Sequence, residues 1–167
     1  MEGCPEVNFQ NLLILKPTYQ WVARIDDEAV RNTRDVDLLV RRADFAAART
    51  ALETAGFVYH HLLDVDVFID GPQGKSSAGL HLLFAGEKVR GEDEHPCPEL
   101  DESERAAEFQ VVSLLALVRM KLTAWRDKDR THLRDLIQVG HIDRTWLPRL
   151  QPPLSNRLQE LLDNPNG

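Results

Sequence analysis

The sequence predicts an α/β (α+β) fold in which a mixed β-sheet is flanked by helices and followed by a helical C-terminal tail. Residues 35–40 form a nearly continuous apolar run after a polar segment, which is typical of a central strand covered on both faces. Residues 43–55 carry apolar side chains at helical spacing. Further β-rich segments then follow the first strand and helix, at residues 57–63, 65–69 and 80–85.

Glycine and proline mark the expected ends of these elements. Gly56 follows the first helix, residues 71–75 read as a turn, and Gly86 ends the last of the three β-rich segments. The acidic stretch 91–103 contains two prolines and is expected to be an exposed connecting loop. A mixed sheet follows, because several strands come directly after one strand–helix unit.

The C-terminal third is expected to be helical. Ser113 can cap a helix that carries Leu114, Leu117, Val118 and Leu122, and Asp127 can cap the next. After a break at residues 148–153, Ser155 can cap a last helix. The chain length suits one domain over 1–167, divided into an atypical N-terminal segment (1–20), a sheet core (21–90), the acidic loop (91–103) and the helical tail (104–167).

Composition restricts the classes of function. The net charge of -7 argues against a protein that coats nucleic acid, and it favours a small-molecule partner. Six basic residues between Arg119 and Arg134 nevertheless leave room for a local anion site. Apolar runs are too short to span a membrane, and Cys4 and Cys97 match no zinc-ligand spacing, so we expect a cytoplasmic protein with reduced thiols.

Asp35 and Asp37 are the most informative candidate site residues. Alternation along a strand places both carboxylates on one face, close enough to share a divalent cation such as magnesium. Two adjacent carboxylates repel each other unless a cation neutralises them. The alternative is that they are ordinary acids facing solvent at the end of a strand.

The surrounding residues carry a resemblance to a known family. The run Thr33-Arg34-Asp35-Val36-Asp37-Leu38-Leu39-Val40, followed by a helix ending in Ala55-Gly56-Phe57, resembles the core of the nucleotidyltransferase superfamily. The segments Arg119-Met120-Lys121, Arg126-Asp127-Lys128-Asp129-Arg130 and Leu133-Arg134-Asp135-Leu136 are similar to the helical tail of its uncharacterised bacterial members. The resemblance covers roughly residues 30 to 140, and its functional core is the Asp-x-Asp pair.

The resemblance implies transfer of a nucleoside monophosphate from a nucleoside triphosphate to an acceptor that the sequence does not name. In the family, three carboxylates hold two Mg²⁺ ions, and Asp35 and Asp37 match the first two. His81 stands where the third carboxylate is expected, which would weaken one metal site or shift its preference toward a metal such as Mn²⁺. Asp66 or Asp70 on the adjacent hairpin could substitute, and His81 could equally be a structural residue.

Phosphate contacts are expected from Thr33, Lys121 and Arg126. The alternative for the basic helical tail is a solvated face with acidic partners, which we favour for Lys128 and Arg130. A second departure from the family lies upstream, where residues 11–22 lack the Gly-Gly or Gly-Ser turn that lets a backbone approach a triphosphate.

These departures leave enzyme activity open and support a rival hypothesis. The chain could be a catalytically degenerate nucleotidyltransferase fold that serves as a binding or dimerisation module, for example in a toxin–antitoxin or resistance context. In one version of this hypothesis, residues 12–15 form an exposed edge strand that pairs with a second copy of the chain.

Overall fold

The computed structural model describes residues 13–14, 36–62, 65–75, 79–106 and 109–165. These residues form one seven-stranded sheet in the order β3-β4-β5-β2-β1-β7-β6. The pairs β2–β5 and β1–β7 are parallel, and the other four neighbouring pairs are antiparallel. The mixed sheet with flanking helices that the sequence predicts is therefore confirmed.

Strand β1 (Leu13–Ile14) lies inside the sheet and corrects the edge-strand hypothesis. Leu13 pairs with Leu39 of β2 (Val36–Val40) on one side and with Gln110 of β7 (Phe109–Val112) on the other. Both of its backbone edges are therefore occupied within the chain. Pairing with a second copy through this strand is excluded, because an edge that already has a neighbour cannot accept another strand.

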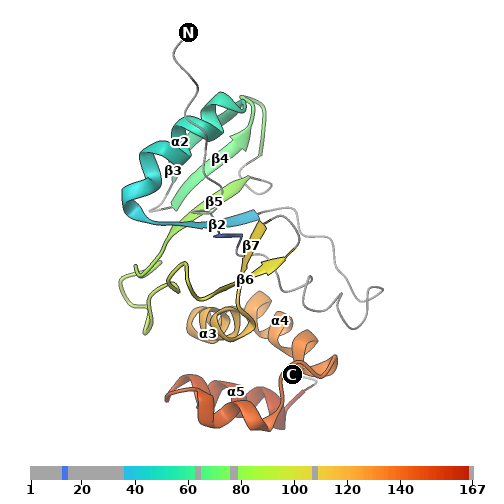
Figure 1. Cartoon of the computed structure of the whole chain (residues 1–167). Coiled ribbons are helices and arrows are strands. Elements are labelled where there is room, and N and C mark those ends of the chain that lie inside the picture. The colour runs from blue at the N-terminus through green and yellow to red at the C-terminus, as the bar shows by residue number, and fades with distance from the viewer. Residues whose placement is uncertain (1–12, 15–35, 63–64, 76–78, 107–108, 166–167) are drawn as a thin grey trace.

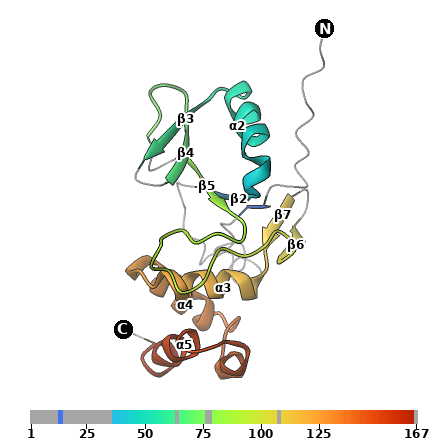
Figure 2. The ribbon, with the colours of Figure 1, turned by 90° about the vertical axis from the view of Figure 1, so that its left-hand side faces the viewer.

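Helices cover both faces of the sheet (Figures 1 and 2). Helix α2 (Phe45–Thr54) lies on one face, where Ala48 packs with Leu38, Val40, Phe68 and Leu82. Helices α3 (Leu114–Ala124), α4 (Asp127–Gln138) and α5 (Leu154–Asp163) lie on the other face, where their apolar residues pack with Leu39. Alternate residues of β2 thus point into two different cores, which explains why its sequence is apolar almost throughout.

The predicted elements of the sheet core are confirmed with small changes at their ends. Strands β3 (Phe57–Leu62), β4 (Val65–Asp70) and β5 (Leu80–Phe84) follow α2 as expected. Gly56 and Gly86 have φ angles of 95° and 71°, the left-handed conformation that glycine adopts without strain. A short 3-10 turn, η2 (Arg42–Asp44), precedes α2.

The region after residue 103 is helical only in part. Strands β6 (Ser103–Ala106) and β7 pair antiparallel at the edge of the sheet before α3 begins. The predicted helical tail from residue 104 was therefore wrong for residues 104–106 and 109–112. Ser113 caps α3 as predicted, since its hydroxyl accepts a hydrogen bond from the Ala116 amide. The N-caps of α4 and α5 are Arg126 and Pro153, one and two residues before the predicted caps Asp127 and Ser155.

The acidic stretch 91–103 is less exposed than predicted. Most of it has no regular structure, as expected, but Cys97 is 5% exposed and joins the core under α3 to α5. The Cys97 amide donates to the Glu87 carbonyl at 2.8 Å, which ties this segment to the end of β5. The segment from Ala85 to Glu102, here called the β5–β6 segment, therefore packs against the helices.

Helix α5 and the 3-10 turn η4 (Arg144–Arg149) close the lower core in Figure 1. Leu154, Leu158 and Leu161 are buried on one side of α5, with the spacing of an amphipathic helix. No helix in the described part of the chain is long and apolar enough to cross a membrane.

Candidate functional site

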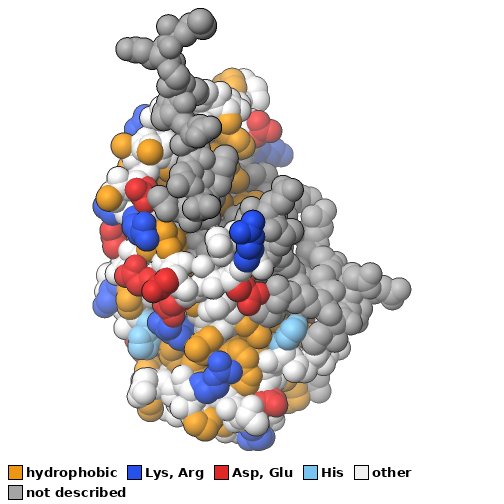
Figure 3. Space-filling view, in the orientation of Figure 1, with side chains coloured by type: hydrophobic (Ala, Val, Ile, Leu, Met, Phe, Trp, Pro, Cys, Tyr) orange, Lys and Arg blue, Asp and Glu red, His pale blue; other side chains and the backbone are white. Residues whose placement is uncertain are grey.

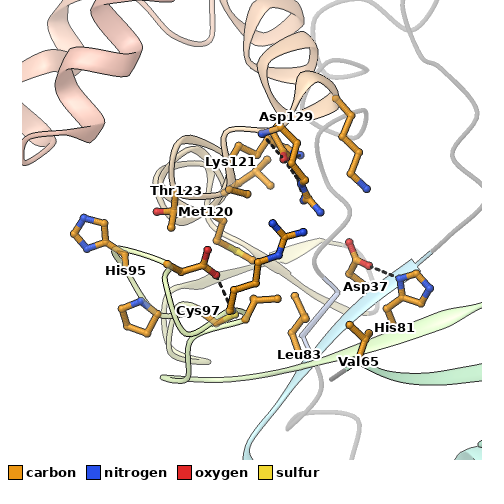
Figure 4. Close-up of a pocket in the computed structure, with 18 residues that line it drawn as sticks. Asp37, Val65, His81, Leu83, His95, Cys97, Met120, Lys121, Thr123 and Asp129 are labelled. Carbon is orange, nitrogen blue, oxygen red and sulfur yellow. Dashed lines mark hydrogen bonds and ion pairs between the residues drawn. The ribbon is translucent and has the colours of Figure 1, made fainter. Parts of the chain in front are cut away.

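A pocket lies between the α3 face of the sheet, helices α3 and α4, and the β5–β6 segment (Figure 4). Asp37 of β2 and His81 of β5 form its sheet wall. They are cross-strand partners in the parallel pair, so their side chains leave the same face. The Asp37 Oδ1 and His81 Nδ1 atoms are 3.5 Å apart, and about a third of each side chain is exposed.

The helical wall carries a cluster of two cations around one buried carboxylate. Asp129 of α4 is 3% exposed. Its Oδ2 accepts a hydrogen bond from Arg126 Nε at 2.6 Å, and its Oδ1 lies 3.6 Å from Lys121 Nζ of α3. Lys121 Nζ also lies 2.9 Å from His132 Nδ1. Asp129 therefore fixes the position of both predicted phosphate ligands, Lys121 and Arg126.

Burial and charge act on the titration of this cluster. Burial lowers the pKa of Lys121, although the charges of Asp129 and Asp37 oppose this shift. Burial alone would raise the pKa of Asp129, but the hydrogen bond from Arg126 and the charge of Lys121 outweigh it and lower the pKa. The charge of Asp37 on the sheet wall therefore acts on the titration of Lys121 on the helical wall.

A tight turn between α3 and α4 creates this cluster. Helix α3 ends at Ala124, Trp125 adopts a left-handed conformation with φ of 49°, and Arg126 is already the N-cap of α4. A bulky residue in that conformation is strained and is held by its surroundings. The turn redirects the chain within two residues, so that α4 begins directly after α3 ends and Asp129 lies within 3.6 Å of Lys121.

The β5–β6 segment forms the third wall of the pocket. It contributes Arg90, Asp93, His95 and Cys97, and Figure 4 shows His95 and Cys97 on the side away from Asp37. Burial, followed by the nearby carboxylates of Asp93 and Glu87, raises the pKa of the Cys97 thiol to about 12. Cys97 is therefore a packing residue at the base of this wall, because a thiol that stays protonated is a weak nucleophile and metal ligand.

The structure brings together four of the seven predicted site residues. Asp37, His81, Lys121 and Arg126 all line the pocket. Asp35 and Thr33 lie outside the described residues. The seventh, Asp66, is on the opposite face of the sheet.

Asp66 has partners of its own on the α2 face. It is the cross-strand neighbour of Leu82, whose side chain belongs to the core under α2. Its Oδ1 accepts a hydrogen bond from the Tyr59 hydroxyl at 2.6 Å and lies 2.9 Å from His61 Nδ1. Asp66 therefore does not join Asp37 as a metal ligand, because the alternation along β4 turns it away from the pocket. Val65, which directly precedes Asp66 in β4, points to the other face and lines the pocket.

The donor set at the sheet wall fits a metal only in part. Within the described ranges, no group of three or more His, Cys, Asp and Glu side chains is placed to hold a metal ion. Asp37 and His81 supply two candidate ligands. Mg²⁺ is commonly held by one or two carboxylates while waters and substrate phosphates complete its coordination. Asp37 fits that pattern, and a site with His81 beside it favours a metal that accepts nitrogen, such as Mn²⁺.

Sequence reasoning missed two features of the site. Asp129 was seen only as part of a charge run, although an acid three residues after a helix N-cap is a recognisable capping pattern. The contribution of Arg90 to the pocket was missed because it lies directly before the segment 91–103, which was expected to be an exposed loop. No local pattern predicts that a segment rich in Gly, Pro and acids will fold over a pocket.

The charged side chains that line the pocket include one more cation than carboxylate, although the whole chain has a net charge of -7. Arg90, Lys121, Arg126 and Lys128 line it, against three carboxylates from Asp37, Asp93 and Asp129. On the face of the molecule shown in Figure 3, acidic and basic side chains are interspersed. Comparisons with known proteins found no matching family model, no matching curated protein and no matching solved structure.

Proposed function

We propose that the pocket binds a nucleoside triphosphate with a divalent cation and that the protein transfers the nucleoside monophosphate to an acceptor nucleophile, as a cytoplasmic enzyme. One observation carries the proposal. Asp37 stands on one wall of the pocket, and a cluster of cations stands on the opposite wall. A metal-bound triphosphate needs both, a carboxylate for the metal and cations for the phosphate oxygens.

Each residue has a defined part in this proposal. Asp37, together with Asp35 of the same Asp-x-Asp pair, would hold Mg²⁺ or Mn²⁺, and His81 would supply a further ligand. The metal, when bound, neutralises charge on the phosphates that bridge to it. Lys121 and Arg126 orient the phosphate chain from the other wall, and Asp129 holds them in place. Positioning and charge stabilisation are the main contributions that a protein makes to phosphoryl and nucleotidyl transfer.

A specific observation favours a second candidate function. His81 lies 3.5 Å from Asp37 and occupies the position where the family resemblance places a third carboxylate. A site with fewer oxygen ligands binds Mg²⁺ more weakly. The second candidate is therefore a nucleotide-binding module of nucleotidyltransferase type that has lost transfer activity.

Two measurements on the same protein separate these candidates. Calorimetric titration with ATP, GTP, CTP and UTP, each with Mg²⁺ or Mn²⁺, tests binding. Release of pyrophosphate from the nucleotide that binds best, in the presence of a mixture of hydroxyl-bearing acceptors, tests transfer. Binding with metal-dependent pyrophosphate release supports the enzyme, and binding without release supports the module. Failure to bind any of the four nucleotides with either metal contradicts both.

A further inference from the structure

The cations of the pocket differ in whether a carboxylate already neutralises them. Arg126 and Lys121 share Asp129, whose oxygens lie 2.6 Å from Arg126 Nε and 3.6 Å from Lys121 Nζ. Among the described residues, the side chains of Arg90 and Lys128 line the same pocket without a hydrogen bond or ion pair, and of these two only Arg90 carries a planar guanidinium. A cation without a protein partner keeps its full charge and all its donors for a ligand.

Arg90 is held on a rigid turn. Its amide donates to Asp93 Oδ2 at 2.9 Å, and the Asp93 amide donates to the Arg90 carbonyl at 3.0 Å. The chain is also anchored directly after this turn. Glu94 Oε2 forms an ion pair at 3.0 Å with Arg157 of α5, and Cys97 is buried. A side chain on a backbone fixed in this way loses less entropy when it binds than one on a mobile loop.

We propose that Arg90 is the principal anion-binding residue of the pocket, where its guanidinium contacts the phosphate chain of a nucleoside triphosphate or of an inorganic polyphosphate. Binding of a nucleoside triphosphate by Arg90 rests on the proposed function, whereas binding of an inorganic polyphosphate does not. Lys121 and Arg126, which Asp129 neutralises in part, then make weaker contacts with the phosphate chain from the helical wall. A guanidinium suits this role because its planar fork can donate two hydrogen bonds to one phosphate.

The neighbouring Lys88 provides a matched control. Lys88 is an exposed residue two positions before Arg90 in the β5–β6 segment, but it lines a different pocket, on the side of Arg42 and His61. Arg90→Gln and Lys88→Gln remove the same charge from nearby surface positions. Arg90→Lys keeps the charge and removes only the planar fork. All three substitutions replace exposed side chains, so the fold should tolerate them.

The test is calorimetric titration of the full chain, the three variants and Arg126→Gln with inorganic tripolyphosphate and, separately, with ATP and Mg²⁺. We expect Arg90→Gln to weaken tripolyphosphate binding by about 10- to 100-fold, the usual effect of losing a charge-assisted hydrogen bond. Lys88→Gln should change it by less than about threefold, as expected of an exposed charge outside the pocket. Arg90→Lys should lie between the two.

The outcomes separate this inference from the proposed function. Tripolyphosphate binding that depends on Arg90, with no binding of ATP, would support the anion site and contradict the nucleotide-binding proposal. Equal effects of Arg90→Gln and Lys88→Gln, or no binding of tripolyphosphate by the unmodified protein, would overturn the role of Arg90. A larger loss from Arg126→Gln than from Arg90→Gln would also overturn it, because Arg126 would then be the principal contact.

Discussion

Asp37 and His81 face each other across the parallel strands β2 and β5, with 3.5 Å between a carboxylate oxygen and a ring nitrogen. This pair occupies the sheet wall of the pocket, opposite the cations of α3 and α4. Replacing His81 with a carboxylate would put two oxygen ligands side by side. A single substitution at His81 therefore tests whether this pair binds a metal.

We predict that His81→Asp tightens Mg²⁺-dependent nucleotide binding, on the order of tenfold, which corresponds to one added charge-assisted contact. The reason is that Mg²⁺ prefers oxygen to nitrogen ligands. Titration of ATP with Mg²⁺ measures the change. His95→Asp is the control, because His95 lines the same pocket but on the β5–β6 segment, away from Asp37. If His81→Asp folds and binds no better than the unmodified protein, His81 is not at a metal site.

Asp129→Asn should destabilise the fold by about 3 kcal/mol, the lower end of what breaking a buried ion pair costs. The substitution leaves buried Lys121 without its carboxylate, although Arg126 is half exposed and can turn to water. Urea denaturation measures the free energy of unfolding. Asp127→Asn serves as the control, because the Asp127 side chain is 92% exposed and its loss should cost less than about 0.5 kcal/mol. Similar values for the two variants would contradict the structural role given to Asp129.

The stabilising effect of Asp129 should depend on pH in a defined direction. Its pKa in the folded protein is lowered from an ordinary value of 3.8, since the hydrogen bond from Arg126 and the charge of Lys121 outweigh burial. Between the two pKa values the unfolded state binds more protons, so stability is fully present above the unfolded pKa and is lost as pH falls through the folded one. The stability gap between the unmodified protein and Asp129→Asn should therefore be constant from pH 7 to about 5 and shrink below about 4. A gap that widens in acid would show the opposite shift.

Cys97 should react very slowly with thiol reagents in the folded protein. A pKa of about 12 leaves almost no thiolate at pH 8, whereas an unfolded cysteine is partly ionised there. In a Cys4→Ser background, which leaves one thiol, we expect reaction with a chromogenic disulfide to be at least about 10³-fold slower in buffer than in concentrated urea. Comparable rates in both conditions would mean that the β5–β6 segment does not bury Cys97.

The sequence predicted the sheet core well because its signals are local. The apolar run of β2, the helical spacing of α2 and the glycines after α2 and β5 each act over a few residues. The pairing of β6 with β7 was missed because each strand has only four residues and lies next to strongly helical sequence. The position of β1 was missed because strand order is set by pairing between residues far apart in the chain.

The candidate site was predictable where side chains follow the periodicity of one element. Asp37 and His81 could be placed on two strands by pattern, and the structure makes them neighbours. Asp66 shows the limit, because the choice between the two faces of β4 depends on its register with β5. The partnership of Asp129 with Lys121 and Arg126 depends on the turn at Trp125, and no sequence pattern predicts a left-handed conformation for a tryptophan.

The central claim is that Asp37 takes part in metal-dependent nucleotide binding, and one titration tests it most directly. ATP is titrated into the unmodified protein, Asp37→Asn and the control Asp70→Asn, each with Mg²⁺ and with a chelator. Asp70 is exposed and lies four positions after Asp66 on β4, so alternation places it on the α2 face, away from the pocket. We expect binding that needs Mg²⁺, is kept in Asp70→Asn and is lost in Asp37→Asn. Mg²⁺-dependent binding that is unchanged in a folded Asp37→Asn variant would contradict it.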